Sequence, residues 1–130
     1  MAQIVTADLC VIGAGSGGLT VAAVASQLGL ATVLSERAKM GGDCLNYGCV
    51  PSKALIAAGN AAEAVRRAPQ FGVDAGAPRA DFARVHAHVR DVIASIAPQD
   101  SAERFAGLGV RVIAAEARFI ARDGVRKAGL

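Results

Sequence analysis

The feature that most constrains the fold is a glycine-rich segment at residues 13–18, Gly-Ala-Gly-Ser-Gly-Gly. A short apolar run at residues 8–12 precedes it and predicts a buried strand, and the Ala-, Val- and Leu-rich run at 19–28 predicts a helix. A second apolar run at 31–34 predicts another buried strand, parallel to the first. Together these elements predict a right-handed β-α-β unit of about thirty residues. The expected fold is therefore α/β, with a parallel sheet flanked by helices.

The glycine spacing, Gly13-x-Gly15-x-x-Gly18, is typical of a turn that binds an adenine dinucleotide. Gly13 allows the tight turn, Gly15 lets the backbone approach a pyrophosphate, and Gly18 lets the helix pack close to the strand. The helix N-terminus adds free N–H groups and a partial positive charge. Glu36 follows Gly18 by 18 residues and can accept hydrogen bonds from a ribose diol, whereas its charge would repel a 2′-phosphate. The pattern favours a Rossmann-like domain that binds FAD or NAD rather than NADP, and the alternative is a turn without a ligand.

Further helices and strands are expected after this unit. We expect a helical region at residues 44–67, a loop rich in proline and glycine at 68–79, and a third helix capped by Asp81. Apolar residues at about 110–113 predict another strand, and residues 117–120 are expected to continue the sheet. The third helix has an apolar face at helical spacing, which consists of Phe82, Val85, Val89, Val92, Ile93 and Ile96.

Composition argues against several classes of function. Of the 130 residues 53% are hydrophobic, which is enough to build the core of one domain. A net charge of +3, an aromatic content of 4% and the lack of tryptophan argue against a nucleic-acid partner. Three cysteines cannot form a fully paired secreted framework, and the first residues lack the basic region of a secretory signal. We therefore expect a cytoplasmic protein.

An uncharged stretch at residues 9–35 is long enough to cross a bilayer. The glycine cluster breaks it near its start, and Gln27 and Gly29 interrupt it further on. A strand, a turn, a helix and a second strand fit this pattern better than one membrane helix does, so no membrane partner is expected.

Two cysteines, Cys44 and Cys49, stand five residues apart. In an ideal helix such residues have Cα atoms roughly 8–9 Å apart, whereas a disulfide needs about 4.4–6.8 Å. A bridge therefore requires a distorted backbone, which Gly48 and Pro51 favour. We expect a helix N-terminus and the nearby Lys53 to lower a thiol pKa and favour the reactive thiolate.

Metal binding and inert thiols are the alternatives for this pair. A C-x₄-C pair without a second ligand pair is poor zinc spacing. His86 and His88 lie two residues apart on different faces of the third helix, so we expect a helix surface there and no metal site. The remaining thiol, Cys10, lies in the first predicted strand and is expected to be a small buried hydrophobic residue.

Residues 41–53, Gly-Gly-Asp-Cys-Leu-Asn-Tyr-Gly-Cys-Val-Pro-Ser-Lys, closely resemble a family when they are taken together with the glycine turn and Glu36. The family is that of the FAD-dependent pyridine nucleotide–disulfide oxidoreductases, and the resemblance is nearest to its dihydrolipoamide dehydrogenase and mercuric reductase branches. It extends through Phe119. The resemblance implies that Cys44 is the interchange thiol that attacks the substrate disulfide and that Cys49 is the charge-transfer thiol beside the flavin.

The resemblance also implies a set of cofactor-binding residues. Lys53 would stabilise negative charge on the flavin, Glu36 would bind the adenosine ribose, and the backbone of Ala117 would contact the adenine edge. The full set that the resemblance implies for FAD is Gly13, Gly15, Ser16, Gly18, Glu36, Arg37, Gly41, Gly42, Asp43, Cys44, Lys53 and Ala117.

The activity implied by the resemblance is electron transfer from NAD(P)H through FAD to a Cys44–Cys49 bridge. The bridge would then reduce a small acceptor, either a disulfide of the dihydrolipoamide type or mercuric ion. Residues 1–130 would form the N-terminal FAD-binding segment of such an enzyme, which is a homodimer in the full-length family.

The NAD(P)H and dimerisation domains of the family are absent from these residues, and residues 123–130 follow its pattern poorly, so we expect the chain to be inactive on its own. A non-catalytic dinucleotide-binding remnant is one alternative. A domain of the flavin monooxygenase or NAD-binding kind, in which the cysteines are incidental, is another.

Overall fold

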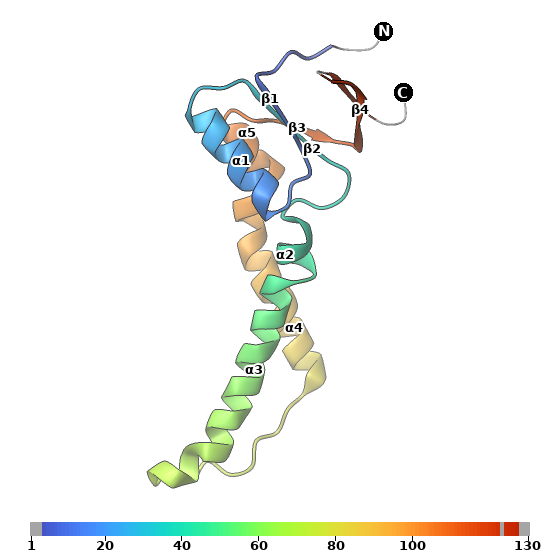
Figure 1. Ribbon diagram of the computed structural model, residues 1–130. Coiled ribbons are helices and arrows are strands. Elements are labelled where there is room, and N and C mark those ends of the chain that lie inside the picture. Colours follow the sequence, from blue (N-terminus) through green and yellow to red (C-terminus); the bar gives the residue numbers. More distant parts are fainter. Residues whose placement is uncertain (1–3, 123, 128–130) are drawn as a thin grey trace.

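The computed structural model describes residues 4–122 and 124–127 (Figure 1). Along the chain its elements are β1 (Leu9–Ile12), α1 (Ser16–Gln27), β2 (Thr32–Glu36), α2 (Gly42–Asn46), α3 (Cys49–Arg67), the 3-10 helix η1 (Ala68–Phe71), α4 (Phe82–Ile96), the 3-10 helix η2 (Ala97–Asp100), α5 (Ala102–Gly107), β3 (Arg111–Ala114), β4 (Ala117–Ala121) and β5 (Gly124–Lys127). Helices α3 and α4 pack against each other and project away from the strands as a long pair.

A three-stranded parallel sheet in the order β1-β2-β3 carries the fold, and the α/β prediction is confirmed. Val11, Leu34 and Val112 stand in register on one face of this sheet. Leu19 of α1 and Phe105 of α5 join them in the core, and Phe105 is only 2% exposed. The predicted β-α-β unit is present: the apolar strand β1, the glycine turn, α1 and the apolar strand β2 follow one another in the predicted order.

The prediction for Cys10 is wrong, because its side chain is exposed. Neighbouring strand residues point to opposite faces, so Cys10 and Ile12 face away from the core face that Val11 occupies. Ile12 is itself 43% exposed, which shows that this face of β1 is open to solvent. The apolar run alone could not tell which face of the strand is covered.

The predicted helical region at 44–67 consists of two helices, α2 and α3. Tyr47 and Gly48 separate them, and both donate a backbone N–H to the carbonyl of Asp43, over 2.9 and 2.6 Å. A Cβ at Gly48 would lie 3.1 Å from that same carbonyl oxygen. The backbone irregularity expected between the two cysteines is therefore present, and it places them on different helices.

Helix α4 begins as predicted. The Asp81 carboxylate accepts from the N–H groups of Ala83 and Arg84 over 2.9 and 3.2 Å. His86 and His88 are both exposed on this helix, as expected for a helix surface.

Helix α5 was not predicted. Its N-terminus is capped by Ser101, whose hydroxyl accepts from the N–H of Arg104 over 3.2 Å. The glycines at 107 and 109 are typical of a turn, but Gly107 is the last residue of a helix that buries Phe105.

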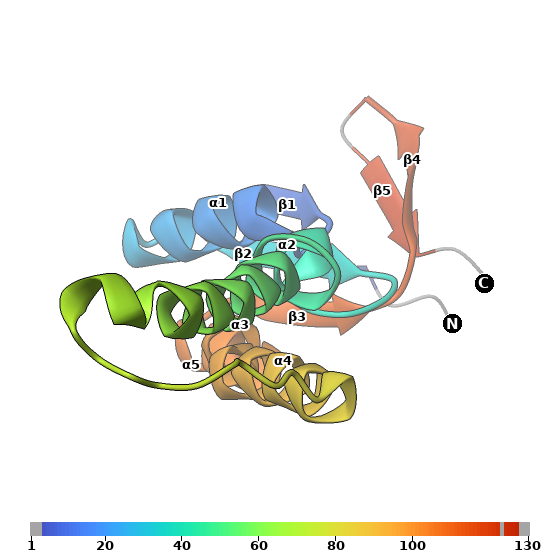
Figure 2. The same cartoon turned by 90° about the horizontal axis from the view of Figure 1, so that it is seen from below.

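The expectation that residues 117–120 continue the sheet is wrong. Strand β4 pairs antiparallel with β5, in a separate two-stranded sheet that stands apart from the parallel one (Figure 2). Only Ala115 and Glu116 separate β3 from β4, whereas a return to a parallel sheet requires a crossover of about a dozen residues. Of the segment 123–130, residues 123 and 128–130 lie outside the described part.

Across residues 4–122 and 124–127, no helix combines the length and the apolar character that a membrane crossing requires. The uncharged stretch at residues 9–35 forms β1, the glycine turn, α1 and the start of β2.

Candidate functional site

A cavity of about 430 Å³ lies at the carboxyl ends of β1 and β2, in front of the glycine turn. The end of a parallel sheet, beside a helix N-terminus, is where ligands bind in such folds. Seven residues predicted from the sequence line it together: Gly13, Gly15, Glu36, Arg37, Gly42, Asp43 and Ala117. The other predicted residues, which are Ser16, Gly18, Gly41, Cys44, Cys49 and Lys53, are not part of its wall.

The glycine turn has the geometry that its spacing predicted. Gly13 has a φ of 99°, and a Cβ at Gly18 would clash with the Gly13 carbonyl. Gly15 differs, because a Cβ there would meet no atom within 4 Å and would occupy open space beside the cavity. The N-cap residue of α1 is Gly15, which has no side chain to cap the helix, so the first N–H groups of α1 can bind an anion.

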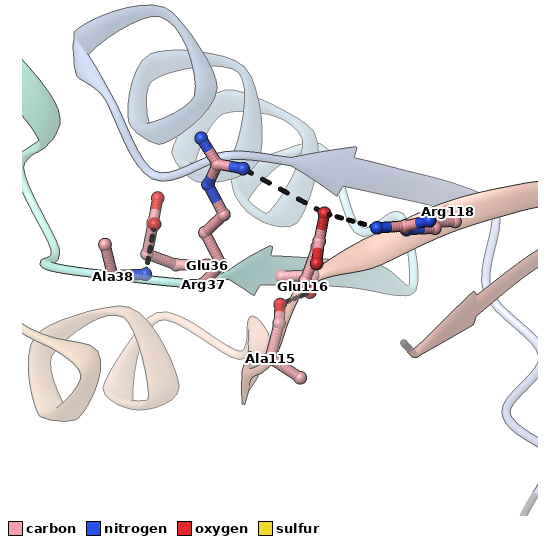
Figure 3. Close-up of polar contacts among 7 residues, drawn as sticks. Glu36, Arg37, Ala38, Ala115, Glu116 and Arg118 are labelled. Atoms are coloured by element: carbon pink, nitrogen blue, oxygen red, sulfur yellow. Dashed lines mark hydrogen bonds and ion pairs between the residues drawn. The ribbon is translucent and has the colours of Figure 1, made fainter. Parts of the chain in front are cut away.

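Glu36 holds this turn through its carboxylate. One oxygen accepts from the N–H of Ala14 and the other from the N–H of Ala38, each over 2.7 Å (Figure 3 shows the bond to Ala38). The N–H of Gly13 donates to the Ser35 carbonyl over 2.7 Å, which adds a second link between the turn and β2. The sequence suggested only a ligand contact for Glu36, whereas the structure adds a role in fixing the turn.

The loop before α2 packs directly on the glycine turn. The N–H of Gly41 donates to the carbonyl of Ala14 over 2.9 Å. Gly41 and Gly42 have φ angles of 87° and 58°, and a Cβ at Gly42 would lie 2.7 Å from the Cα of Gly15. Close packing on the glycine turn and positive φ angles fix both residues.

The two thiols lie within hydrogen-bonding reach of each other and are not bridged in this structure. The hydrogen bond to Cys49 raises the pKa of the Cys44 thiol above its ordinary value of 9.0, and burial and the charge of Cys49 act in the same direction. The backbone of Cys49 and the positive charge of Lys53 oppose this increase. The expected lowering by Lys53 is therefore present but is outweighed at Cys44, which keeps its proton at neutral pH.

This balance predicts a pH profile for alkylation of the reduced protein. The rate for Cys44 should reach half its maximum above pH 9.0, and Cys49→Ala should move that midpoint down because the hydrogen bond and the charge disappear. Iodoacetamide labelling followed by peptide mass spectrometry separates Cys44 from Cys10, which is also a free thiol. The same midpoint in both proteins would contradict the assignment.

Several residues at the site gave no signal in the sequence. Glu116 pairs with Arg37 over 3.9 Å and with Arg118 over 3.4 Å (Figure 3), and it also lines the cavity. These side chains are largely exposed, so the pairs add little stability. The Nζ of Lys39 lies 5.5 Å from the ring centre of Tyr47 at the cavity wall. Such contacts depend on how β3 turns into β4 and how α2 meets the loop, which no local pattern specifies.

A second, apolar groove of about 370 Å³ lies between α3 and α4. Tyr47 lines both this groove and the cavity at the glycine turn. His86 lies in the groove wall, and within the described ranges no group of three or more His, Cys, Asp or Glu residues could hold a metal ion.

Comparison with known proteins identifies what the chain is similar to. The family model described as pyridine nucleotide-disulphide oxidoreductase matches residues 7–128, which extends past the Phe119 limit expected from the sequence. A dihydrolipoyl dehydrogenase of Bacillus subtilis is 39% identical over 119 residues, which cover 92% of this chain and 25% of that protein. A dihydrolipoyl dehydrogenase of Chlamydia trachomatis is 52% identical over 66 residues, which cover 51% of this chain and 14% of that protein.

One solved structure shares the fold. It is described as the Cu(II) complex of the HOCl-induced flavoprotein disulfide reductase RclA from Escherichia coli, with a TM-score of 0.73 and 24% identity. The match covers 92% of this chain and 24% of that one. This chain thus spans a quarter or less of the length of these relatives.

Proposed function

Since the chain belongs to the pyridine nucleotide-disulphide oxidoreductase family, we propose that residues 1–130 form the FAD-binding, thiol-bearing segment of such an enzyme. Electrons from NAD(P)H would pass through FAD to the Cys44–Cys49 pair and then to a small acceptor. The observation that carries this proposal is the direct packing of Gly41 and Gly42, at the start of the helix that holds Cys44, on the glycine turn, which brings the two motifs together.

The residues at the cavity fit the adenosine diphosphate part of FAD. The open space at Gly15 admits a pyrophosphate, and the uncapped N-terminus of α1 supplies donors to it. The Glu36 oxygens that accept backbone N–H groups still have lone pairs for ribose hydroxyls. Ala117 also lines the cavity, and its backbone would contact the adenine edge. When bound, FAD would supply a two-electron carrier beside the thiols.

The thiols themselves can carry two electrons. Oxidation of the pair forms one S–S bond and releases two protons and two electrons, and reduction of an acceptor disulfide consumes the same number of each. Cys44 would attack the acceptor after its proton is removed, because its raised pKa keeps the thiol neutral at pH 7. Lys53 would favour the negative forms of this pair and of the flavin.

The acceptor that we propose is a disulfide of the dihydrolipoamide type, since the sequence relatives quoted above are dihydrolipoyl dehydrogenases. Mercuric ion is the other acceptor that the motif suggests. We also propose that the whole enzyme works as a homodimer in the cytoplasm.

A comparison of thiol variants tests the proposal. With FAD bound and the thiols reduced, Cys49→Ser should remove the long-wavelength absorbance of a thiolate beside the flavin, whereas Cys44→Ser should keep it. Cys10→Ser is the matched control, because Cys10 lies on the open face of β1, outside the cavity wall. If the band is absent in the unmodified protein or survives in Cys49→Ser, the role of the pair is wrong. A segment that binds FAD without this band would be the second candidate, a non-catalytic dinucleotide-binding remnant.

A further inference from the structure

We propose that Asn46, which lies between the two cysteines in the sequence, is a positioning residue. It holds α2, the helix that contains Cys44, against the glycine turn and thereby sets the redox equilibrium of the thiol pair. This inference rests on the proposed function, because it concerns the same thiols. Asn46 is half-buried and lies outside both cavity walls, so it acts through other residues.

The side-chain amide of Asn46 donates twice. Its Nδ2 lies 2.8 Å from the carbonyl oxygen of Gly42 and 3.1 Å from that of Met40. The two carbonyls lie on either side of Gly41, the residue with a left-handed conformation that immediately precedes α2. One amide therefore holds both sides of the bend that leads into the helix.

The same bend contacts the glycine turn. Gly41 donates to the Ala14 carbonyl over 2.9 Å, and Gly42 lies so close to Gly15 that a Cβ at Gly42 would have no room. Glu36 holds the other side of Ala14 by accepting its N–H. A continuous set of contacts thus runs from the ribose-binding acid through the turn and the bend to Asn46.

Helix α2 needs this support because it is only five residues long. A helix of that length has few internal hydrogen bonds and is unstable by itself. The Asn46 amide adds two hydrogen bonds, both to carbonyl oxygens at the start of this short helix. Cys44 lies in this helix and Cys49 begins the next one, so the orientation of α2 sets how the two sulfurs meet.

The two hydrogen bonds of the Asn46 side chain require an amide at this position. Both partners are acceptors, so the side chain must offer two N–H donors from one atom, which an amide does and a carboxylate does not. Asn46→Asp keeps the shape but places negative charge against two carbonyl oxygens. A loosened α2 must become ordered again whenever the bridge forms, which disfavours the disulfide.

The test is the equilibrium between the dithiol and the bridged chain in dithiothreitol redox buffers. Alkylation and peptide mass spectrometry separate the Cys44–Cys49 pair from Cys10. Asn46→Asp should lower the equilibrium constant for bridge formation at least tenfold, which corresponds to about 30 mV for a two-electron couple. Asn46→Gln, which keeps both donors, should stay within threefold of the unmodified chain. Asn60→Asp is the matched control, because Asn60 is exposed on α3.

The outcomes separate the two proposals. If the unmodified chain forms no Cys44–Cys49 bridge, the proposed function fails. If it does form the bridge and Asn46→Asp lowers the equilibrium constant less than tenfold, the role of Asn46 is rejected. Circular dichroism checks that each variant folds, and Asn46→Ser, which keeps one donor, replaces Asn46→Asp should the latter unfold. For Asn46→Ser a decrease of at least threefold supports the role, and a smaller change rejects it.

Discussion

Gly18→Ala should destabilise the protein by about 2 kcal/mol or more, since an added methyl group has no room in this backbone. The Cβ would clash with the Gly13 carbonyl and would lie 3.3 Å from the Val11 side chain. Neither neighbour can yield easily, because Val11 is buried in the core and Gly13 is held by its bond to Ser35. Helix α1 would have to move away from β1, which opens the core.

Gly17→Ala provides a control in the same helical turn. A Cβ at Gly17 would meet no atom within 4 Å, and alanine is the better helix former by about 0.5–1 kcal/mol. Urea unfolding followed by circular dichroism should therefore show the two variants shifting in opposite directions. Equal free energies of unfolding for both would show that the close approach of α1 to the turn is not the reason for glycine at Gly18.

Glu36→Gln should weaken FAD binding roughly 10- to 100-fold, the range expected when hydrogen bonds to a charged group are lost, about 1.5–3 kcal/mol. A glutamine side chain keeps one acceptor oxygen but turns a donor toward one of the two backbone N–H groups that the carboxylate now binds, at Ala14 or Ala38. The glycine turn would lose part of its support together with the proposed ribose acceptor.

Flavin fluorescence titration measures this effect, and Glu63→Gln is the matched control. Glu63 pairs with Arg66 on the exposed surface of α3, a contact that contributes little. An affinity of Glu36→Gln within twofold of the unmodified protein would contradict both roles assigned to the acid. A fall in affinity together with an unchanged free energy of unfolding would assign Glu36 to the ligand alone.

The β-α-β unit could be predicted because its signals are local. The segments predicted as strands, 8–12 and 31–34, are mostly apolar, and the glycine turn between them has a fixed spacing, so pattern and fold agree. The cap at Asp81 was predictable for the same reason, since an Asx side chain bonds the next turn of its own chain. Helix α5 is short and ends at Gly107, so its burial of Phe105 depends on tertiary packing rather than on sequence periodicity.

The predictions that were wrong failed because they depend on contacts between residues far apart in the sequence. The exposure of Cys10 depends on which face of the sheet is covered, and the apolar run 9–12 is the same for either face. Strand β4 is not part of the parallel sheet because the connection from β3 is too short for a parallel crossover. This reason can be recognised only when the strand order is known. The second role of Glu36 and the bonds of Asn46 both end on backbone atoms that the fold brings near, and a residue pattern does not encode such partners.

The absence of any gap between Gly42 and Gly15 has a practical consequence for protein engineering. The two motifs meet backbone to backbone, so neither can be treated as a portable module. Grafting the cysteine-bearing segment onto another nucleotide-binding scaffold would succeed only if the recipient turn is replaced at the same time, because Gly42 needs a turn backbone that it can approach this closely and a side chain at Gly42 would hold the two pieces apart.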